Sequence, residues 1–230
     1  MKALQTIVCL TVAALVAASL TSRAHAQEAN PDKPAQPEKK EGLGFIAEQK
    51  AKARRTLAIM NAKQIGIALI QFEMDYGAFP NEKTAAQVKT SSGINAEVKA
   101  ETANDCFFQL IAGKVAENDK IFSLEKAKDS EHPANQKPLE KLEKCSYAYV
   151  SGMTASVNPG RPLVVAPLVK GKTTFDSQVL GGKAVILRVD CSVVLLPIES
   201  DGRVLIDGKD IFDPAQPFWD GKVPPVKWPE

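Results

Sequence analysis

The stretch that decides the fold is TLAIMNAKQIGIALIQFEMDYGAFP, which runs from Thr56 to Pro80. It has no proline before its last residue, and its apolar residues recur at intervals of three and four, the period of an amphipathic helix. With the polar residues before it, the stretch predicts one helix over residues 46–76.

The apolar half of this helix carries two stripes of side chains. The first has the spacing of one buried face and consists of Leu57, Ile65, Ala68, Leu69, Phe72 and Tyr76. The second lies roughly opposite and consists of Ile59, Ile67, Ile70 and Met74, interrupted only by Lys63. Either both stripes are buried within the domain, or one packs on a sheet while the other meets a partner. The second interpretation predicts a partner-binding surface made of Ile59, Lys63, Ile67, Ile70 and Met74.

The residues before the helix predict export. Lys2 gives a short basic start, Ile7 to Leu20 is an apolar run, and Ala24-His25-Ala26 is a small-residue cleavage site, so residues 1–26 resemble a cleaved secretory signal peptide. The alternative is that this segment stays as an anchor, although its apolar run is short for a membrane span. Residues 27–44 are rich in Pro, Lys, Glu and Gln and predict a flexible linker. We therefore expect an exported protein of the periplasm, the cell surface or the exterior.

The charge balance argues against a nucleic-acid partner. The full chain has 29 basic and 27 acidic side chains. Removing residues 1–26 takes away Lys2 and Arg23 and no acidic residue, which leaves the mature chain close to neutral. Without a net positive field or an arginine cluster, binding to nucleic acid is not expected.

Beyond Pro80 the pattern predicts an α+β domain. Residues 81–101 are polar, with a turn at 91–93, and residues 121–124 predict a short extended piece. An apolar segment at 106–111 predicts a second helix, with Asn104 or Asp105 as the N-cap and Gly113 as the C-cap. Runs of β-branched and aromatic residues predict strands at 145–150, 163–169, 184–189, 192–198 and 203–206.

These elements predict a single domain over residues 45–230, with a long N-terminal helix packed on an antiparallel sheet. Asp190 and Cys191 stand where a two-residue hairpin turn is expected, and Cys191 occupies the place where glycine is usual because φ is positive. The Pro-rich tail from Asp213 to Glu230 is expected to wrap the domain surface.

The cysteines permit a disulfide if the chain is exported. The mature chain keeps Cys106, Cys145 and Cys191, and the sequence does not choose among the three pairings. We prefer a bridge between Cys106 and Cys145, with Cys191 free. Three reduced thiols, or an intermolecular bridge through the leftover thiol, are the alternatives.

The sequence offers no recognisable catalytic constellation. The mature chain has one histidine, His132, in a charged loop without a cysteine or second histidine at metal-ligand spacing. A phosphate-binding glycine loop is missing, and the aspartates Asp201, Asp207, Asp210 and Asp213 lack calcium-loop spacing and stand in predicted turns. We therefore expect no enzyme activity, no metal and no cofactor.

Residues 56–80 resemble the segment shared by type II secretion pseudopilins and other bacterial pilin-like proteins. In those families an Asn-x-Lys-Gln-Ile-Gly-x-Ala-Leu core leads to Asp-x-Gly-x-Phe/Tyr-Pro. The matching residues are Asn61, Lys63, Gln64, Ile65, Gly66, Ala68, Leu69, Phe72, Asp75, Gly77, Phe79 and Pro80. A moderate likeness continues through 104–110 and 118–122 to the hairpin at 181–198, where Asp190 is usually followed by glycine. The resemblance implies a pilin-like head in which Asp75 and Gly77 end the long helix, with Gly77 in the left-handed conformation. It also implies that Pro80 prevents the helix from resuming and that Phe79 packs back onto the domain.

This chain departs from the family at its N-terminus. Family members have a prepilin leader cut before a Phe, followed by about 20 apolar residues, whereas here Gly44-Phe45 is followed by the charged stretch from Gln49 to Arg55. The resemblance implies a pilin-like head without its hydrophobic stem. We expect it to bind other proteins of a type IV pilus or type II secretion-like envelope system, with a homo-oligomer as a further option. The alternative is a secreted ligand- or glycan-binding module that uses Trp219, Trp228 and the tail.

Overall fold

The computed structural model describes residues 38–125 and 139–230, with side chains from Gly44 onward. The chain divides into two units, Met1–Glu38 and Lys39–Glu230, and the second is the one described here. The predicted signal peptide, most of the predicted linker and the loop with His132 lie outside the described residues. Of the helices described, none is both long enough and apolar enough to cross a membrane.

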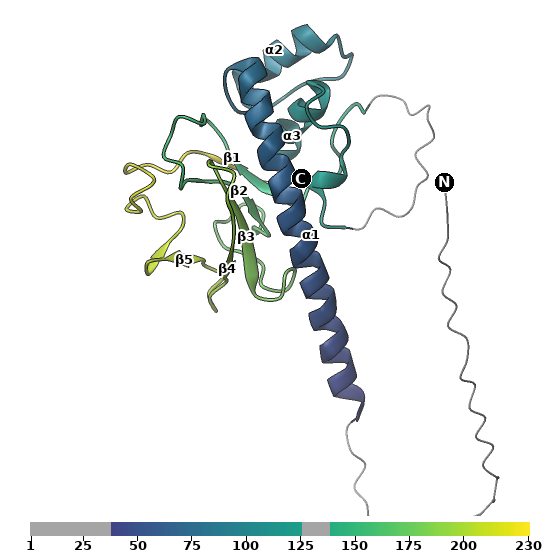
Figure 1. Ribbon diagram of the computed structural model, residues 1–230, viewed down its shortest axis with the longest axis vertical. Helices are drawn as coiled ribbons and strands as arrows, with labels where there is room; N and C mark the ends of the chain where they lie inside the picture. The colour runs from purple at the N-terminus through teal and green to yellow at the C-terminus, as the bar shows by residue number, and fades with distance from the viewer. Residues whose placement is uncertain (1–37, 126–138) are drawn as a thin grey trace, which may run out of the picture. The chain divides into compact units, whose positions relative to one another are not determined.

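The long helix predicted from residues 46–76 is present and begins earlier. Helix α1 spans Glu38–Tyr76, so residues 38–44 of the predicted linker are helical. Its buried face contains Ile65, Ala68, Leu69 and Phe72 of the first apolar stripe, whereas Leu57 and Tyr76 are half-buried. Figure 1 shows α1 lying against the antiparallel sheet. The fully or nearly fully buried side chains of this face are Ala58, Ala62, Ile65, Ala68, Leu69 and Phe72.

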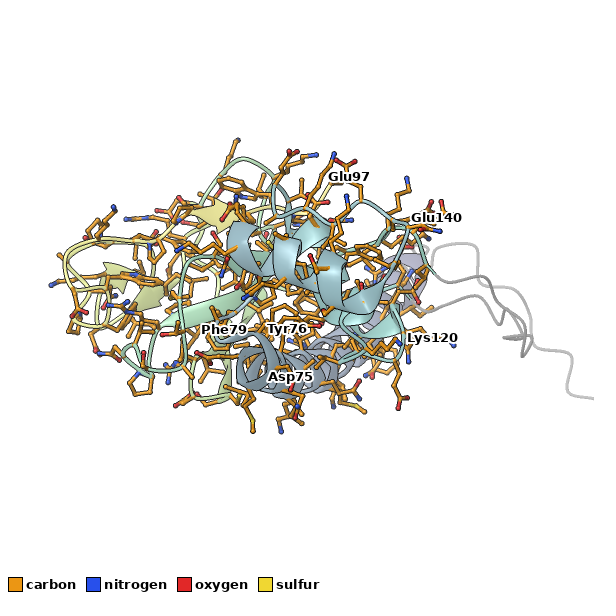
Figure 2. All side chains as sticks on the ribbon, turned by 90° about the horizontal axis from the view of Figure 1, so that it is seen from above. Asp75, Tyr76, Phe79, Glu97, Lys120 and Glu140 are labelled. Atoms are coloured by element: carbon orange, nitrogen blue, oxygen red, sulfur yellow. The ribbon has the colours of Figure 1, made fainter. Side chains whose placement is uncertain are left out.

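The end of α1 follows the expectation from DYGAFP. Gly77 has φ +79°, and its N–H donates a 2.7 Å hydrogen bond to the Glu73 carbonyl, which closes the helix. Phe79 is completely buried. Figure 2 labels Asp75, Tyr76 and Phe79 where α1 ends, and the Tyr76 hydroxyl lies 3.2 Å from the Ser91 hydroxyl of the next helix. The motif is a helix stop that also anchors the turn into the next element.

The polar stretch after Pro80 contains a helix that the sequence did not lead us to expect. Helix α2 spans Glu82–Ser92. Asn81 is its N-cap and forms a capping box with Thr84, and Gly93 ends it in the left-handed conformation. Only Thr84, Ala85 and Val88 are buried, which explains why the apolar pattern is weak.

Two local predictions in the next segment need correction. Helix α3 spans Ala103–Ala112 and ends at Gly113 as predicted, but its N-cap is Thr102, in a capping box with Asp105. Asn104 lies inside the helix instead, where its side-chain amide donates to the Leu142 carbonyl. The piece expected to be extended is the 3-10 helix η1, Lys120–Phe122, which buries Phe122.

The second half of the domain is an antiparallel sheet, as predicted. Its strands are β1 Ala148–Val150, β2 Pro162–Ala166, β3 Lys183–Arg188, β4 Val193–Pro197 and β7 Val226–Lys227. They follow the order β4-β3-β2-β1-β7, and every pairing is antiparallel. Strands β5 Leu205–Ile206 and β6 Lys209–Asp210 form a separate small hairpin. The α+β class, with a long N-terminal helix on an antiparallel sheet, is therefore confirmed.

The β3–β4 hairpin differs from the expected two-residue turn. The Cys191 N–H donates to the Arg188 carbonyl, and the Arg188 N–H donates to the Ser192 carbonyl, so the loop holds three residues. Such loops need one residue with left-handed backbone, and Cys191 supplies it with φ +63°. The hairpin meets α1 at Gly66, where an added Cβ would lie 3.1 Å from Leu187 and 3.4 Å from the Cys191 sulfur.

The C-terminal tail packs on its own domain. Val226 and Lys227 pair with Val150 and Tyr149 and so add the edge strand β7. The Trp228 carbonyl accepts a hydrogen bond from the Ala103 N–H at the start of α3. The tail thus joins the sheet to a helix that lies more than a hundred residues earlier in the chain.

Candidate protein-interaction surface

The five predicted partner-binding residues lie along α1 but do not share one environment. Ile67 and Met74 are 68% and 76% exposed, and Lys63 is also exposed. Ile59 and Ile70 are half-buried and pack against the core. The surface that α1 offers to a partner is therefore rotated away from Ile59 and Ile70.

The close contact at Gly66 explains this rotation. At about 100° per residue, Ile59 and Ile70 lie within about 40° of Gly66 around the helix axis. Because the β3–β4 hairpin approaches the helix at Gly66, it covers the neighbouring positions on that side. Sequence periodicity does not reveal which flank of a helix a hairpin will cover.

Exposed apolar side chains on α1 form a row that includes a residue we did not predict. Met60 is 55% exposed, and it stands seven residues before Ile67 and fourteen before Met74. The same interval leads back to Ala53, which is exposed, and Ile46, which is 63% exposed. We call Ile46, Ala53, Met60, Ile67 and Met74 the α1 row. The seven-residue spacing was present in the sequence, but the polar neighbours of its first half hid it.

The α1 row points away from the domain. A seven-residue interval falls short of two turns by about 20°, so the five positions stay within about 80° of one another. On the same helical wheel, the middle of the row lies roughly 140° to 180° from the buried positions Ala58, Ile65 and Leu69. One face of α1 packs on the sheet, and the opposite face presents apolar side chains to solvent.

The N-terminal part of α1 has no cover within its own unit. Every residue from Gly44 to Lys50 is exposed, and the ribbon of this part extends past the strands in Figure 1. Packing against the rest of the unit begins near Ala51, whose Cβ lies 3.0 Å from the Cβ that a substitution at Gly181 would add. The exposed part carries Phe45 and Ile46, each 63% exposed. A helical segment that packs on nothing is only marginally stable in water.

The charges along α1 are unevenly distributed. Residues 45–55 carry four basic side chains, Lys50, Lys52, Arg54 and Arg55, and one acidic side chain, Glu48. Residues 57–76 carry only Lys63, Glu73 and Asp75. The helix therefore has a positive first half and a weakly negative end.

The cysteines differ from the predicted bridge, because Cys106, Cys145 and Cys191 are all free thiols in the structure. Cys106 is buried near the Ala100 carbonyl, and the Cys145 sulfur lies 3.3 Å from the Tyr147 carbonyl. Burial raises the pKa of both thiols to about 12. At neutral pH both groups are protonated, which makes them poor nucleophiles. Neither thiol builds a reactive site.

The tail tryptophans have their ring N–H groups bound within the domain. Trp219 is 1% exposed, and its Nε1–H donates to the Ile211 carbonyl at 2.6 Å. Trp228 is half-buried, and its Nε1–H donates to the Lys172 carbonyl at 2.9 Å. Trp219 has no open face on which a sugar ring could stack.

The aspartates considered for calcium serve turns. Asp201 forms an ion pair with Arg203 at 2.6 Å, and Asp210 and Asp213 each accept a backbone N–H two residues later. Within residues 38–125 and 139–230, no group of three or more His, Cys, Asp or Glu side chains is placed to hold a metal ion.

Two buried polar atoms in the part of the chain that the structure describes have no hydrogen-bond partner, Arg188 Nε and Ser192 Oγ. Both belong to the β3–β4 hairpin and lie where it closes. They form no cluster with a nucleophile or a carboxylate, so they suggest no chemistry. The α1 row is therefore the candidate functional site.

Comparisons of this chain with protein-family models, with curated proteins and with solved structures found no match.

Proposed function

We propose that this chain is an exported pilin-like protein that acts as a binding or assembly component of a type IV pilus or type II secretion-like envelope system. The observation that carries the proposal is the α1 row, an apolar strip on the outer face of a helix whose inner face packs on the sheet. Apolar surface that recurs in line along a helix is typical of a protein-binding face.

The motif of residues 56–80 supports the pilin-like part of the proposal. Its residues have structural roles of the kind that a shared fold would require. Asn61 is buried and donates to the Ser123 carbonyl, Gly66 allows the hairpin to approach, and Gly77 ends the helix. A partner would meet the outer face of this same helix.

The glycan-binding alternative has less support. A sugar platform needs exposed aromatic faces, and Trp219 is buried while Trp228 is bound at its N–H. The tail instead has a structural role.

The test is site-specific photo-crosslinking in cells of the source organism. A photoreactive residue at Ile67 should crosslink a protein of a pilus or secretion assembly, while one at Gln87, exposed on α2, should not. In a separate pull-down with the chain as bait, Ile67→Asp should abolish recovery of that protein. Leu195→Asp, which changes an exposed apolar residue of β4, should not. Equal crosslinking from Ile67 and Gln87, or recovery unaffected by Ile67→Asp, would overturn the proposal.

A further inference from the structure

The even spacing of the α1 row allows its positions to pair with the same positions of a second copy. Its central residue is Met60, and the other four are placed in pairs at seven and fourteen residues on either side. If two copies of α1 lay antiparallel with their Met60 residues facing each other, Ala53 of each copy would face Ile67 of the other. Ile46 would likewise face Met74. A small side chain would then stand opposite a branched one, the alternation that lets apolar layers interlock.

We propose that the α1 row binds the α1 row of a second copy of this chain, in an antiparallel arrangement with the two Met60 residues at a two-fold axis. This proposal rests on the proposed function in treating the α1 row as an interaction surface, and it names the occupant. A two-fold contact is self-complementary, which is what the row offers.

The charges favour the antiparallel orientation over the parallel one. A parallel pair would set Lys50 and Lys52 of one copy beside those of the other. An antiparallel pair sets Asp75 of one copy near the positive first half of the other. Opposed helix dipoles favour the same orientation. The antiparallel pair therefore avoids the repulsion between the positive first halves of the two helices and gains an attraction between opposite charges.

The placement of the domains also permits this contact. The sheet packs on the face of α1 opposite the row, so in a two-fold pair the two domains lie on the outer sides of the helix pair. The row from Ile46 to Met74 is about 42 Å long at 1.5 Å per residue. The exposed first part of α1, with Phe45 and Ile46, would gain the cover that it lacks in a single copy.

The contact should be reversible rather than obligate. In a stable coiled coil, the positions three residues after the row members would also be apolar. Four such positions lie within α1. Here those positions hold Gln49, Thr56, Lys63 and Ile70, and only the last is apolar. We therefore expect a monomer–dimer equilibrium that depends on concentration and weakens as salt screens the end-to-end charges.

The first experiment measures the mass of the purified full chain by sedimentation over a wide concentration range. A concentration-dependent dimer is expected, and Ile67→Asp should weaken it by about tenfold or more because two charges would enter the apolar contact. Leu195→Asp is the matched control and should leave the dimer unchanged, with circular dichroism showing that both variants fold. A chain that stays monomeric at every concentration would overturn the proposal.

The second experiment tests the register by disulfide trapping in a Cys191→Gly background, which removes the least buried of the three cysteines that the structure describes. Met60→Cys should form a disulfide-linked dimer by itself. Ala53→Cys and Ile67→Cys should not crosslink alone but should do so when mixed, because residue 53 faces residue 67 of the other copy. Self-crosslinking of each single variant would indicate a parallel pair and contradict the proposal.

The two proposals fail separately. If sedimentation finds only monomer while Ile67 still crosslinks an assembly protein in cells, the proposed function stands and the second copy is excluded. If the dimer forms in the predicted register but no assembly protein is recovered, the dimer stands and the proposed function is overturned.

Discussion

Tyr147, just before β1, and Tyr149 of β1 hold α1 and its exit loop through their hydroxyl groups. The Tyr147 hydroxyl donates to the Ala58 carbonyl inside α1 at 3.1 Å, and the Tyr149 hydroxyl donates to the Pro80 carbonyl at 3.0 Å. Both side chains are buried. The two contacts differ in one respect. The Ala58 carbonyl also accepts the ordinary helical hydrogen bond. The Pro80 carbonyl has no other protein donor among the described residues.

This difference gives a prediction about two matched variants. Tyr149→Phe should lower the free energy of unfolding by about 1–3 kcal/mol, because it leaves a buried carbonyl unpaired. Tyr147→Phe should cost about 0.5–1.5 kcal/mol, because the Ala58 carbonyl keeps its helical partner. Urea unfolding of both variants measures the difference. Equal losses would mean that water or a shifted backbone reaches the Pro80 carbonyl.

Cys191 is a residue whose backbone conformation is unfavourable for its type. A non-glycine residue at φ +63° costs about 1–2 kcal/mol relative to an ordinary conformation. Glycine avoids this cost but loses about 0.5–1 kcal/mol through its greater freedom in the unfolded chain. We expect Cys191→Gly to raise the free energy of unfolding by about 0.5–1 kcal/mol.

Cys191→Ala is the control for this prediction, since it removes the same sulfur and keeps the unfavourable conformation. The free energy of unfolding of Cys191→Gly should exceed that of Cys191→Ala by about 1 kcal/mol. Cys191→Gly should therefore unfold at a higher denaturant concentration. Identical midpoints would show that the hairpin changes its backbone when the sulfur is removed.

At the scale of the elements, the N-terminal cap of α2 holds the start of that helix in place. The Asn81 side-chain oxygen accepts hydrogen bonds from the N–H groups of Lys83 at 2.8 Å and Thr84 at 3.2 Å, and the Thr84 hydroxyl accepts the Asn81 N–H at 2.8 Å. The same Thr84 hydroxyl donates to buried Gln109 of α3 at 2.7 Å. The cap of one helix is thus joined to the side of another.

Asn81→Ala should destabilise the protein by about 0.5–2 kcal/mol, because two N–H groups lose their acceptor. Asn81→Ser should recover most of the loss, since serine is also a good N-cap. Asn95→Ala, at an exposed loop asparagine, is the control and should change the midpoint of thermal unfolding little. A loss as large at Asn95 would contradict the role of the cap.

The elements also show what a sequence can and cannot predict. Helix α1 and the main strands were predicted because their apolar patterns are long or dense, and Gly77 marked the end of α1 by its backbone freedom. Helix α2 was missed because it buries few residues, although Asn81 and Gly93 carried the cap signals. Such caps are local, so a closer look at hydrogen-bonding side chains would have found them.

The interaction surface was predicted only in part, for a different reason. Ile67 and Met74 are exposed, as the partner-binding interpretation of the second stripe requires, but Ile59 and Ile70 are half-buried because the hairpin approaches at Gly66. That approach joins residue 66 to residues 187 and 191, and no local pattern encodes it. Whether the exposed residues bind a partner stays a prediction.

At the scale of the whole molecule, residues far apart in sequence complete the sheet. Strand β7 covers the edge of β1, the Ser151 N–H donates to the Pro225 carbonyl at 2.9 Å, and the Glu230 N–H donates to the Asn104 side chain at 3.0 Å. The other edge of the sheet, β4, carries Leu195, which is 39% exposed. The tail therefore protects one edge of the sheet.

Deleting residues 226–230 should lower the free energy of unfolding by roughly 3 kcal/mol or more. Each lost hydrogen bond costs about 1 kcal/mol, and the apolar contacts of Val226 and Trp228 are lost as well. For a domain of this size, the melting temperature should fall by roughly 6–12 °C. Trp228→Ala, which keeps β7, should give a smaller fall in a calorimetric scan. An unchanged melting temperature after the deletion would show that the tail is dispensable.

The position of β7 also decides when the protein can fold. The Ala103 N–H finds its partner on Trp228, so this contact closes a loop of more than a hundred residues. During synthesis, the ribosome must release Val226 and Lys227 before the sheet can gain its last strand. Contacts of such long range form late and slowly. A chain whose sheet cannot be completed until Val226 and Lys227 have emerged stays partly unfolded through much of its synthesis, a state that suits the export we propose.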